Sequence, residues 1–189
     1  MGFNIKPFDK MSCTVEFWKS ILINIFASFI FLFVYETFIK RLFVFFKYKS
    51  LKGYYIVCNQ SGEAFYNSPE GIPNFLKIHI TFWNPNVLTT KSKDFDKTYS
   101  KGWKTWNGKI IMNELTGDYG SGFYVYEEGA EPGLHEIFLK DKSKGTILVR
   151  VTDYGKSNLR EKQDNISELH KWKKVDKSDK LIKDLRKRI

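Results

Sequence analysis

The sequence predicts a mainly β protein, an eight-stranded antiparallel β-barrel that follows an N-terminal transmembrane helix and precedes a short, basic C-terminal helix. Three observations predict this. Residues 20–35 carry no charge, the chain after residue 52 consists of short aromatic β-type runs divided by Gly, Asn, Asp and Pro, and the last residues place apolar side chains at helical spacing. We expect a membrane segment with a basic collar at 1–50, a β-barrel at 51–176 and a basic amphipathic tail at 177–189.

The length and composition fit one domain with an appendage. The chain has 189 residues, including 17 Phe, 10 Tyr and 5 Trp, and this aromatic content disfavours disorder. The only two cysteines, Cys13 and Cys58, provide neither a disulfide framework nor a four-ligand zinc set. A large multidomain enzyme is excluded.

The apolar segment at 17–39 is long enough to cross a bilayer. As a helix it would extend roughly 34 Å, against a hydrocarbon core of about 30 Å. Lys19 and Glu36 lie near its ends, and Trp18 and Tyr35 suit the two interfaces. A buried core helix is the alternative. A cleaved signal peptide is disfavoured, because bulky and charged residues follow the run. Residues 42–46 are too short for a second span and could continue the helix along the interface.

The formal charge of +10 is concentrated outside the expected barrel. Residues 40–52 hold five basic residues and no acid, whereas residues 53–170 hold 14 basic and 15 acidic residues. Residues 171–189 add nine basic residues against three acidic ones. The collar at 40–52 predicts that it and the chain after it face the cytoplasm. A nearly neutral barrel argues against binding of a DNA or RNA polymer.

Eight expected strands occupy 52–59, 75–83, 87–90, 106–114, 117–126, 134–140, 146–153 and 167–175, the third being the weakest. Asn84-Pro85-Asn86 and Thr116-Gly117-Asp118 fit the turns between them. Eight short strands in this length indicate a closed barrel or a sandwich. Alternation divides three strands into two faces; one face holds Leu76, Ile78, Ile80 and Phe82, then His135, Ile137 and Leu139, then Ile147, Val149 and Val151.

No catalytic motif or metal-ligand spacing is present, so neither an enzymatic activity nor a metal is predicted. The stretch from Tyr99 to Trp106 interleaves three rings with two lysines, a mixture that suits stacking on bases and neutralising phosphates. Cross-strand aromatic pairs with solvated lysines are the alternative. Arg150 lies mid-strand and needs an anionic partner, which is a phosphate or else Glu136 or Glu114. The candidate ligand-binding residues are Trp103, Lys104, Trp106, Tyr126 and Arg150.

The tail spaces Leu181, Ile182, Leu185 and Ile189 along one helical face, with basic residues elsewhere. This pattern is typical of a helix that lies on an anionic leaflet. A frayed and solvated tail is the alternative.

The order of parts, together with LKGYY at 51–55, WNGKI at 106–110 and GLHEI at 133–137, resembles the β-barrel membrane effectors of bacterial CBASS anti-phage defence. The resemblance implies a lipocalin-like barrel that senses a cyclic dinucleotide made by a partner CD-NTase, self-associates and disrupts the inner membrane, causing abortive infection. Members of that family typically have two membrane helices, whereas this sequence has one full span. Either a first segment is missing, or the pair is fused into one helix over 17–46.

The sequence therefore favours an inner-membrane receptor and effector, with one or two membrane passes, a cytoplasmic barrel, a cyclic dinucleotide as ligand and no other cofactor. We expect the bilayer and further copies of the chain as partners. A membrane-tethered barrel that binds a lipid or a protein is the alternative, and a membrane-bound hydrolase is a third.

Overall fold

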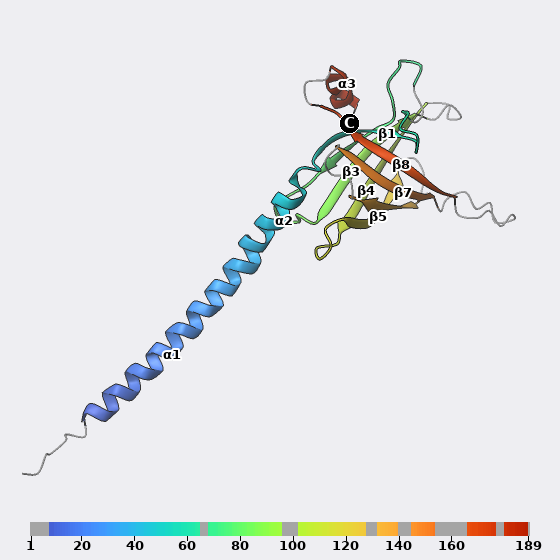
Figure 1. Ribbon diagram of the computed structural model, residues 1–189. Coiled ribbons are helices and arrows are strands. Elements are labelled where there is room, and N and C mark those ends of the chain that lie inside the picture. Colours follow the sequence, from blue (N-terminus) through green and yellow to red (C-terminus); the bar gives the residue numbers. More distant parts are fainter. Residues whose placement is uncertain are drawn as a thin grey trace, which may run out of the picture. The chain divides into compact units, whose positions relative to one another are not determined.

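The computed structural model describes residues 8–64, 68–95, 102–127, 132–139, 145–153, 166–176 and 180–188. The chain divides into two compact units, Met1–Phe43 and Val44–Ile189. Figure 1 shows a long helix in the first unit and a barrel in the second.

The first unit is helical throughout its described residues. Helix α1 (Phe8–Val34) continues through one π-helical segment, η1 (Tyr35–Ile39), into α2 (Lys40–Lys49). Residues 14–49 form the one helix among the described parts that is long and apolar enough to cross a membrane. Its apolar side chains are exposed; Phe26 and Phe29 are 69% and 67% accessible. The expected span at 17–39 therefore lies within a longer, uninterrupted helix, as in the fused alternative.

The second unit is a closed antiparallel barrel in which every strand pairs with its neighbours in sequence, and the last with the first. The predicted eight-stranded barrel and its flanking helices are confirmed. The strands are β1 (Gly53–Cys58), β2 (Phe75–His79), β3 (Val87–Phe95), β4 (Trp103–Met112), β5 (Tyr119–Tyr126), β6 (Pro132–Phe138), β7 (Thr146–Asp153) and β8 (Ile166–Lys174).

The strand boundaries lie within three residues of those expected, except for the ends of β2 and β3. β2 ends at His79 rather than at residue 83, since the chain turns through 82–86. β3 continues to Phe95 rather than stopping at Thr90. Its second half reads as a polar loop because the inward positions there are Ser92 and Asp94, which are not apolar. The register pairs Asp94 with Lys104 and keeps this half in the sheet.

The expected inner faces are confirmed except at Phe82, which lies in the turn after β2, is half-buried and does not belong to the core. The buried core contains Leu76, Ile78, Ile80, Ile137, Leu139, Ile147 and Val149, with Val151 packed against it. Outward positions between them are more exposed, as the alternation of a half-buried strand requires.

The last turn of α2 closes one end of the barrel. The ring of Tyr48 is fully buried in the core, and its hydroxyl donates a hydrogen bond to the carbonyl of Asn113 at 3.1 Å. The Lys47 ammonium donates to the carbonyl of Glu114 in the same turn. Val44 and Phe45 pack against the core. We call this the α2 end, and the opposite end, where β8 begins, the far end.

Helix α3 (Leu181–Arg188) packs on the outside of the barrel wall. Ile182 and Leu185 are 4% and 0% exposed and lie in a cluster with Ile72, Phe75 and Val175. Figure 1 shows α3 beside β1. The apolar face of the tail is therefore covered by the barrel rather than by a leaflet or by water, which corrects both interpretations of the tail. Ile189 lies outside the described residues.

Shortening Leu185 to alanine should loosen α3. The substitution removes a fully buried side chain, so we expect Leu185→Ala to lower the unfolding free energy by about 2–3 kcal/mol and to speed amide exchange in 181–188. Chemical denaturation and hydrogen exchange of the full chain in detergent measure both effects. Lys183→Ala, at an exposed position of the same helix, is the control and should change neither. Equal exchange in both variants would contradict this packing.

Candidate ligand site in the barrel interior

Polar and aromatic side chains gather inside the far half of the barrel. The alternation of β4 points Lys104 and Trp106 inward, and the register sets Trp106 against Tyr126 of β5. Across the barrel, β8 places Glu168 and His170 opposite the inward residues of β7. The α2 half of the interior, by contrast, is filled by aliphatic side chains and the rings of Tyr48 and Tyr55.

Four aromatic rings form one layer at the centre of the interior. His135 stacks on Tyr124 with ring centroids 4.3 Å apart, and its edge faces Trp106 at 4.9 Å and Trp172 at 5.2 Å. Trp106 also contacts Tyr124 at 5.3 Å. All four side chains are at most 4% exposed. The layer therefore separates the aliphatic half of the core from the far end.

A glycine on the neighbouring strand makes room for this layer. A Cβ on Gly133 would lie 2.1 Å from Cζ of Tyr124, so the tyrosine ring occupies the volume that a side chain there would need. Gly108, on the other side of Tyr124, is also crowded: a Cβ there would lie 2.6 Å from Oγ1 of Thr90. The glycines of β4 and β6 thus fix where the tyrosine lies.

Asp94 holds the indole of Trp106 in place. The indole N–H donates to one carboxylate oxygen at 2.7 Å, and the Ser92 hydroxyl donates to the other at 2.8 Å. The same hydroxyl lies 2.9 Å from the carbonyl of Phe75, so the two acceptors share its single proton. A buried indole N–H needs an acceptor, and a charged acceptor gives the stronger bond. The Trp106 ring is consequently fixed in orientation.

Two cationic or ionisable groups lie on the far side of the ring layer. The Lys104 ammonium is 5.1 Å from the centroid of Tyr126, a cation–π contact. Nε2 of His170 lies 3.1 Å from a carboxylate oxygen of Glu168, whose side chain is half exposed. Tyr126 is half-buried and meets Tyr124 edge to face at 5.8 Å. The far end thus combines flat rings with groups of both charge signs.

Two buried polar atoms in the interior have no hydrogen-bond partner among the described residues, namely Oγ1 of Thr90 and Nδ1 of His135. Buried polar groups are normally paired, and an exception needs an explanation. Burial lowers the pKa of His135 to about 3, and the charge of His170 adds to this lowering. His135 is therefore a neutral imidazole at ordinary pH, able to donate or accept one hydrogen bond at each nitrogen according to its tautomer.

Three of the five predicted site residues come together. Lys104, Trp106 and Tyr126 lie on adjacent strands and face the interior. Trp103 points outward, where its ring contacts Phe75 at 6.1 Å and Phe95 at 5.4 Å. Tyr99 and Lys101 lie outside the described residues.

Arg150 also points outward, on β7. Its guanidinium is 3.2 Å from Glu136, and it lies 5.6 Å from the ring of Phe138. Glu136 also accepts a hydrogen bond from the Tyr119 hydroxyl at 2.8 Å. Glu136 is thus the anionic partner named in the sequence analysis as the alternative to a phosphate.

Sequence reasoning missed part of the interior set. Asp94 lies in the second half of β3, which the sequence does not mark as a strand. Thr90 and Trp172 lie in expected strands, but no motif marks them as site residues. His135 was placed on the apolar face, but no signal marked its contact with Tyr124, since Gly133 and Tyr124 meet only through the register of β5 and β6. The described residues contain no cluster of three or more His, Cys, Asp or Glu that could hold a metal ion.

No protein-family model and no curated protein matches the sequence. One solved structure, described as "Structure of EF1p2_mFAP2b bound to DFHBI", aligns over 67% of this chain and 95% of its own, with 12% sequence identity and a TM-score of 0.44.

The neutral His135 predicts an acid-sensitive barrel. The unfolded imidazole has a pKa of about 6.5, so the unfolded state takes up the extra proton and stability falls as the pH drops below that value. We expect a loss of about 2 kcal/mol from this group between about pH 6.5 and about pH 5. His135→Phe should flatten this slope in denaturant titrations of the full chain. His79→Gln removes an exposed imidazole and should leave it unchanged; a slope that His135→Phe also leaves unchanged would refute the assignment.

Proposed function

We propose that the protein is a membrane-anchored receptor for a cyclic dinucleotide and acts as a CBASS-type effector without enzymatic turnover. The observation that supports this best is the inward-facing set at the far end, where the Lys104 ammonium lies 5.1 Å from the ring of Tyr126 and the fixed indole of Trp106 lies beside it. A cation next to flat rings suits a ligand that combines bases and phosphates.

The ligand enters from the far end and reaches the half-buried ring of Tyr126 first. A base stacks on an aromatic ring with about 1–3 kcal/mol of binding free energy, whichever base it is. Lys104 neutralises a phosphate as a point charge. Glu168 and Asp94 carry the opposite sign, and Asp94 already holds two hydrogen bonds, so the site favours a ligand with few rather than many charges.

The unpaired interior atoms suit the polar edge of a base better than a phosphate. Thr90 offers a hydroxyl, and His135 offers a neutral imidazole nitrogen. A base edge presents both donors and acceptors and so pairs with neutral groups of this kind. Because the four rings pack against one another, a base that reaches these atoms must move Tyr124 or Tyr126. Ligand binding therefore couples to rearrangement of the layer.

Such coupling is what an effector needs. A ligand shifts an equilibrium only by its difference in affinity between two states. In our proposal the rearranged barrel self-associates in the cytoplasm and gathers the N-terminal helices in the inner membrane, which disrupts it. The resemblance to CBASS barrel effectors supports this order of events.

The rival is a membrane-tethered barrel that binds a lipid or a protein partner. The aliphatic half of the core favours the lipid, and Lys104 would also pair with the carboxylate of a fatty acid. An acyl chain, however, would leave the unpaired polar atoms of Thr90 and His135 without partners. A thermal-shift panel of the full chain in nanodiscs, with cyclic dinucleotides, fatty acids and buffer alone, separates the two. We expect a rise in Tm only with cyclic dinucleotides; a rise only with fatty acids would reject our proposal.

Removing the cation at the far end should weaken the ligand. Lys104→Met keeps the length of the side chain, deletes one charge-assisted contact worth about 1.5–3 kcal/mol and should raise the Kd of the cyclic dinucleotide about 10- to 100-fold. Isothermal titration measures the change. The matched control is Arg150→Ala, which deletes a cation from the outer face of the same barrel and should leave the Kd unchanged. Equal losses in both variants would place the site elsewhere.

A further inference from the structure

The outer faces of β2, β3 and β4 form a basic wall. Lys77, Lys91, Lys93 and Lys109 point outward from these strands, and the other described outward positions there carry no acidic side chain. The nearly neutral net charge of the barrel does not reveal this wall, because the one acidic residue on these strands, Asp94, points inward. None of the four lysines pairs with a carboxylate among the described residues.

The register places like charges together on this wall. Lys77 lies directly opposite Lys91 across the β2–β3 ladder. Directly opposed like charges destabilise a sheet. A cation–π contact between Lys77 and the ring of Tyr54 at 5.5 Å offsets part of this cost. On the opposite side of the barrel, Arg150 has an acidic partner. The basic wall thus lacks a carboxylate partner of the kind that Arg150 has on β7.

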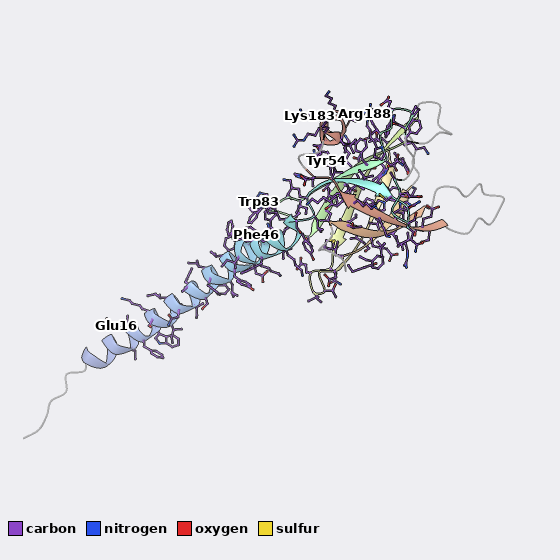
Figure 2. All side chains as sticks on the ribbon, turned by 45° about the horizontal axis from the view of Figure 1, so that its top comes forward. Glu16, Phe46, Tyr54, Trp83, Lys183 and Arg188 are labelled. Carbon is purple, nitrogen blue, oxygen red and sulfur yellow. The ribbon has the colours of Figure 1, made fainter. Side chains whose placement is uncertain are left out.

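Helix α3 extends the basic wall. Its apolar face is buried against β1 and β2, so Lys183, Arg186 and Lys187 remain exposed on its other face. Figure 2 shows Lys183 and Arg188 on α3, with Tyr54 on the neighbouring wall. The tail therefore contributes charge to a surface rather than an apolar face to a leaflet.

An aromatic group lies at the α2 end of the same wall. Trp83, in the turn from β2 to β3, is 59% exposed and contacts the ring of Phe82 at 5.5 Å. Phe82 in turn contacts Phe45, and Phe46 beside it is 60% exposed. Figure 2 shows Trp83 and Phe46 close together. Exposed tryptophan with nearby lysines is typical of surfaces at the membrane interface.

We infer that the basic wall, with the exposed cations of α3 and Trp83, is a peripheral membrane-binding surface for anionic phospholipid headgroups. Lysines near an anionic surface are attracted additively, and salt screens the attraction. The helix at 14–49 is long enough to cross a bilayer, and this tether would raise the effective concentration of lipid at the wall.

Nucleic acid fits this wall less well than lipid. The three strands present no outward arginine, the residue that most often contacts bases. Their outward rings pack in the clusters with α3: Phe75 is fully buried and Trp103 carries the guanidinium of Arg188 at 5.6 Å. The three strands themselves thus leave no exposed ring beside the lysines for base stacking, and the exposed Trp83 lies in the turn after β2. This inference does not depend on the ligand proposed above, since these lysines face away from the interior.

Lysine footprinting of the full chain tests the assignment. The protein is placed in nanodiscs of phosphatidylcholine alone or mixed with phosphatidylglycerol, and acetylation of each lysine is followed by mass spectrometry. We expect Lys77 and Lys109 to react about threefold or more slowly in the anionic nanodiscs, and the difference to vanish at high salt. Equal rates in the two nanodiscs would overturn the inference. Protection by added oligonucleotide but not by phosphatidylglycerol would overturn it in favour of nucleic acid.

A matched pair of variants separates the wall from overall charge. Lys91→Glu with Lys93→Glu should abolish the lipid dependence at Lys77 and Lys109. The control pair is Lys171→Glu with Lys173→Glu, which changes the net charge by the same amount on the outer face of β8. In this pair the lipid dependence at Lys77 and Lys109 should be preserved. Loss of the dependence in both pairs would overturn the inference. Folding is checked by Tm: Lys91→Glu sets an acid opposite Lys77, so the first pair should melt no lower than the unaltered chain.

Discussion

The pairing of β1 with β8 is the constraint on which the rest of the structure depends. This ladder, with Val57 opposite Trp172, removes both sheet edges and leaves every strand residue either inside or outside a closed wall. A shift of one residue would exchange the two sets. Closure therefore decides which rings form the interior layer and which lysines form the basic wall.

The interior is polar where an ordinary core would be apolar. The two carboxylate oxygens of Asp94 accept hydrogen bonds from Ser92 and Trp106. By contrast, Oγ1 of Thr90 and Nδ1 of His135 have no hydrogen-bond partner among the described residues. Burying polar groups without partners lowers the stability of a fold, so such groups tend to occur at functional sites. Here they lie beside the ring layer, next to Lys104 and Tyr126 at the far end. We propose an interior ligand site because these unpaired polar atoms lie next to a cation and to aromatic rings.

In our two proposals, the inside and the outside of the barrel bind different anions. Adjacent residues on β3 illustrate the division: Asp94 points inward to fix an indole, while Lys93 points outward among other lysines. The proposed ligand and the proposed lipid surface therefore would not compete for the same side chains. Helix α3 contacts only the outside of the barrel, since Ile182 and Leu185 pack on the outer face of β1 and β2. It can therefore affect the interior site only through these strands.

The sequence by itself determined the apolar helix, the eight strands and the alternation that placed Ile78, Ile137 and Val149 inside, because these depend on local periodicity. It also put Lys104, Trp106 and Tyr126 in one candidate site. Only the tertiary structure decided that Trp103 and Arg150 face outward, that Tyr124 lies over Gly133 and that the tail covers Phe75. These depend on cross-strand register and on contacts between distant segments. The local sequence does not determine which distant residue lies opposite a given position, because that register is set only when the strands pair and the barrel closes.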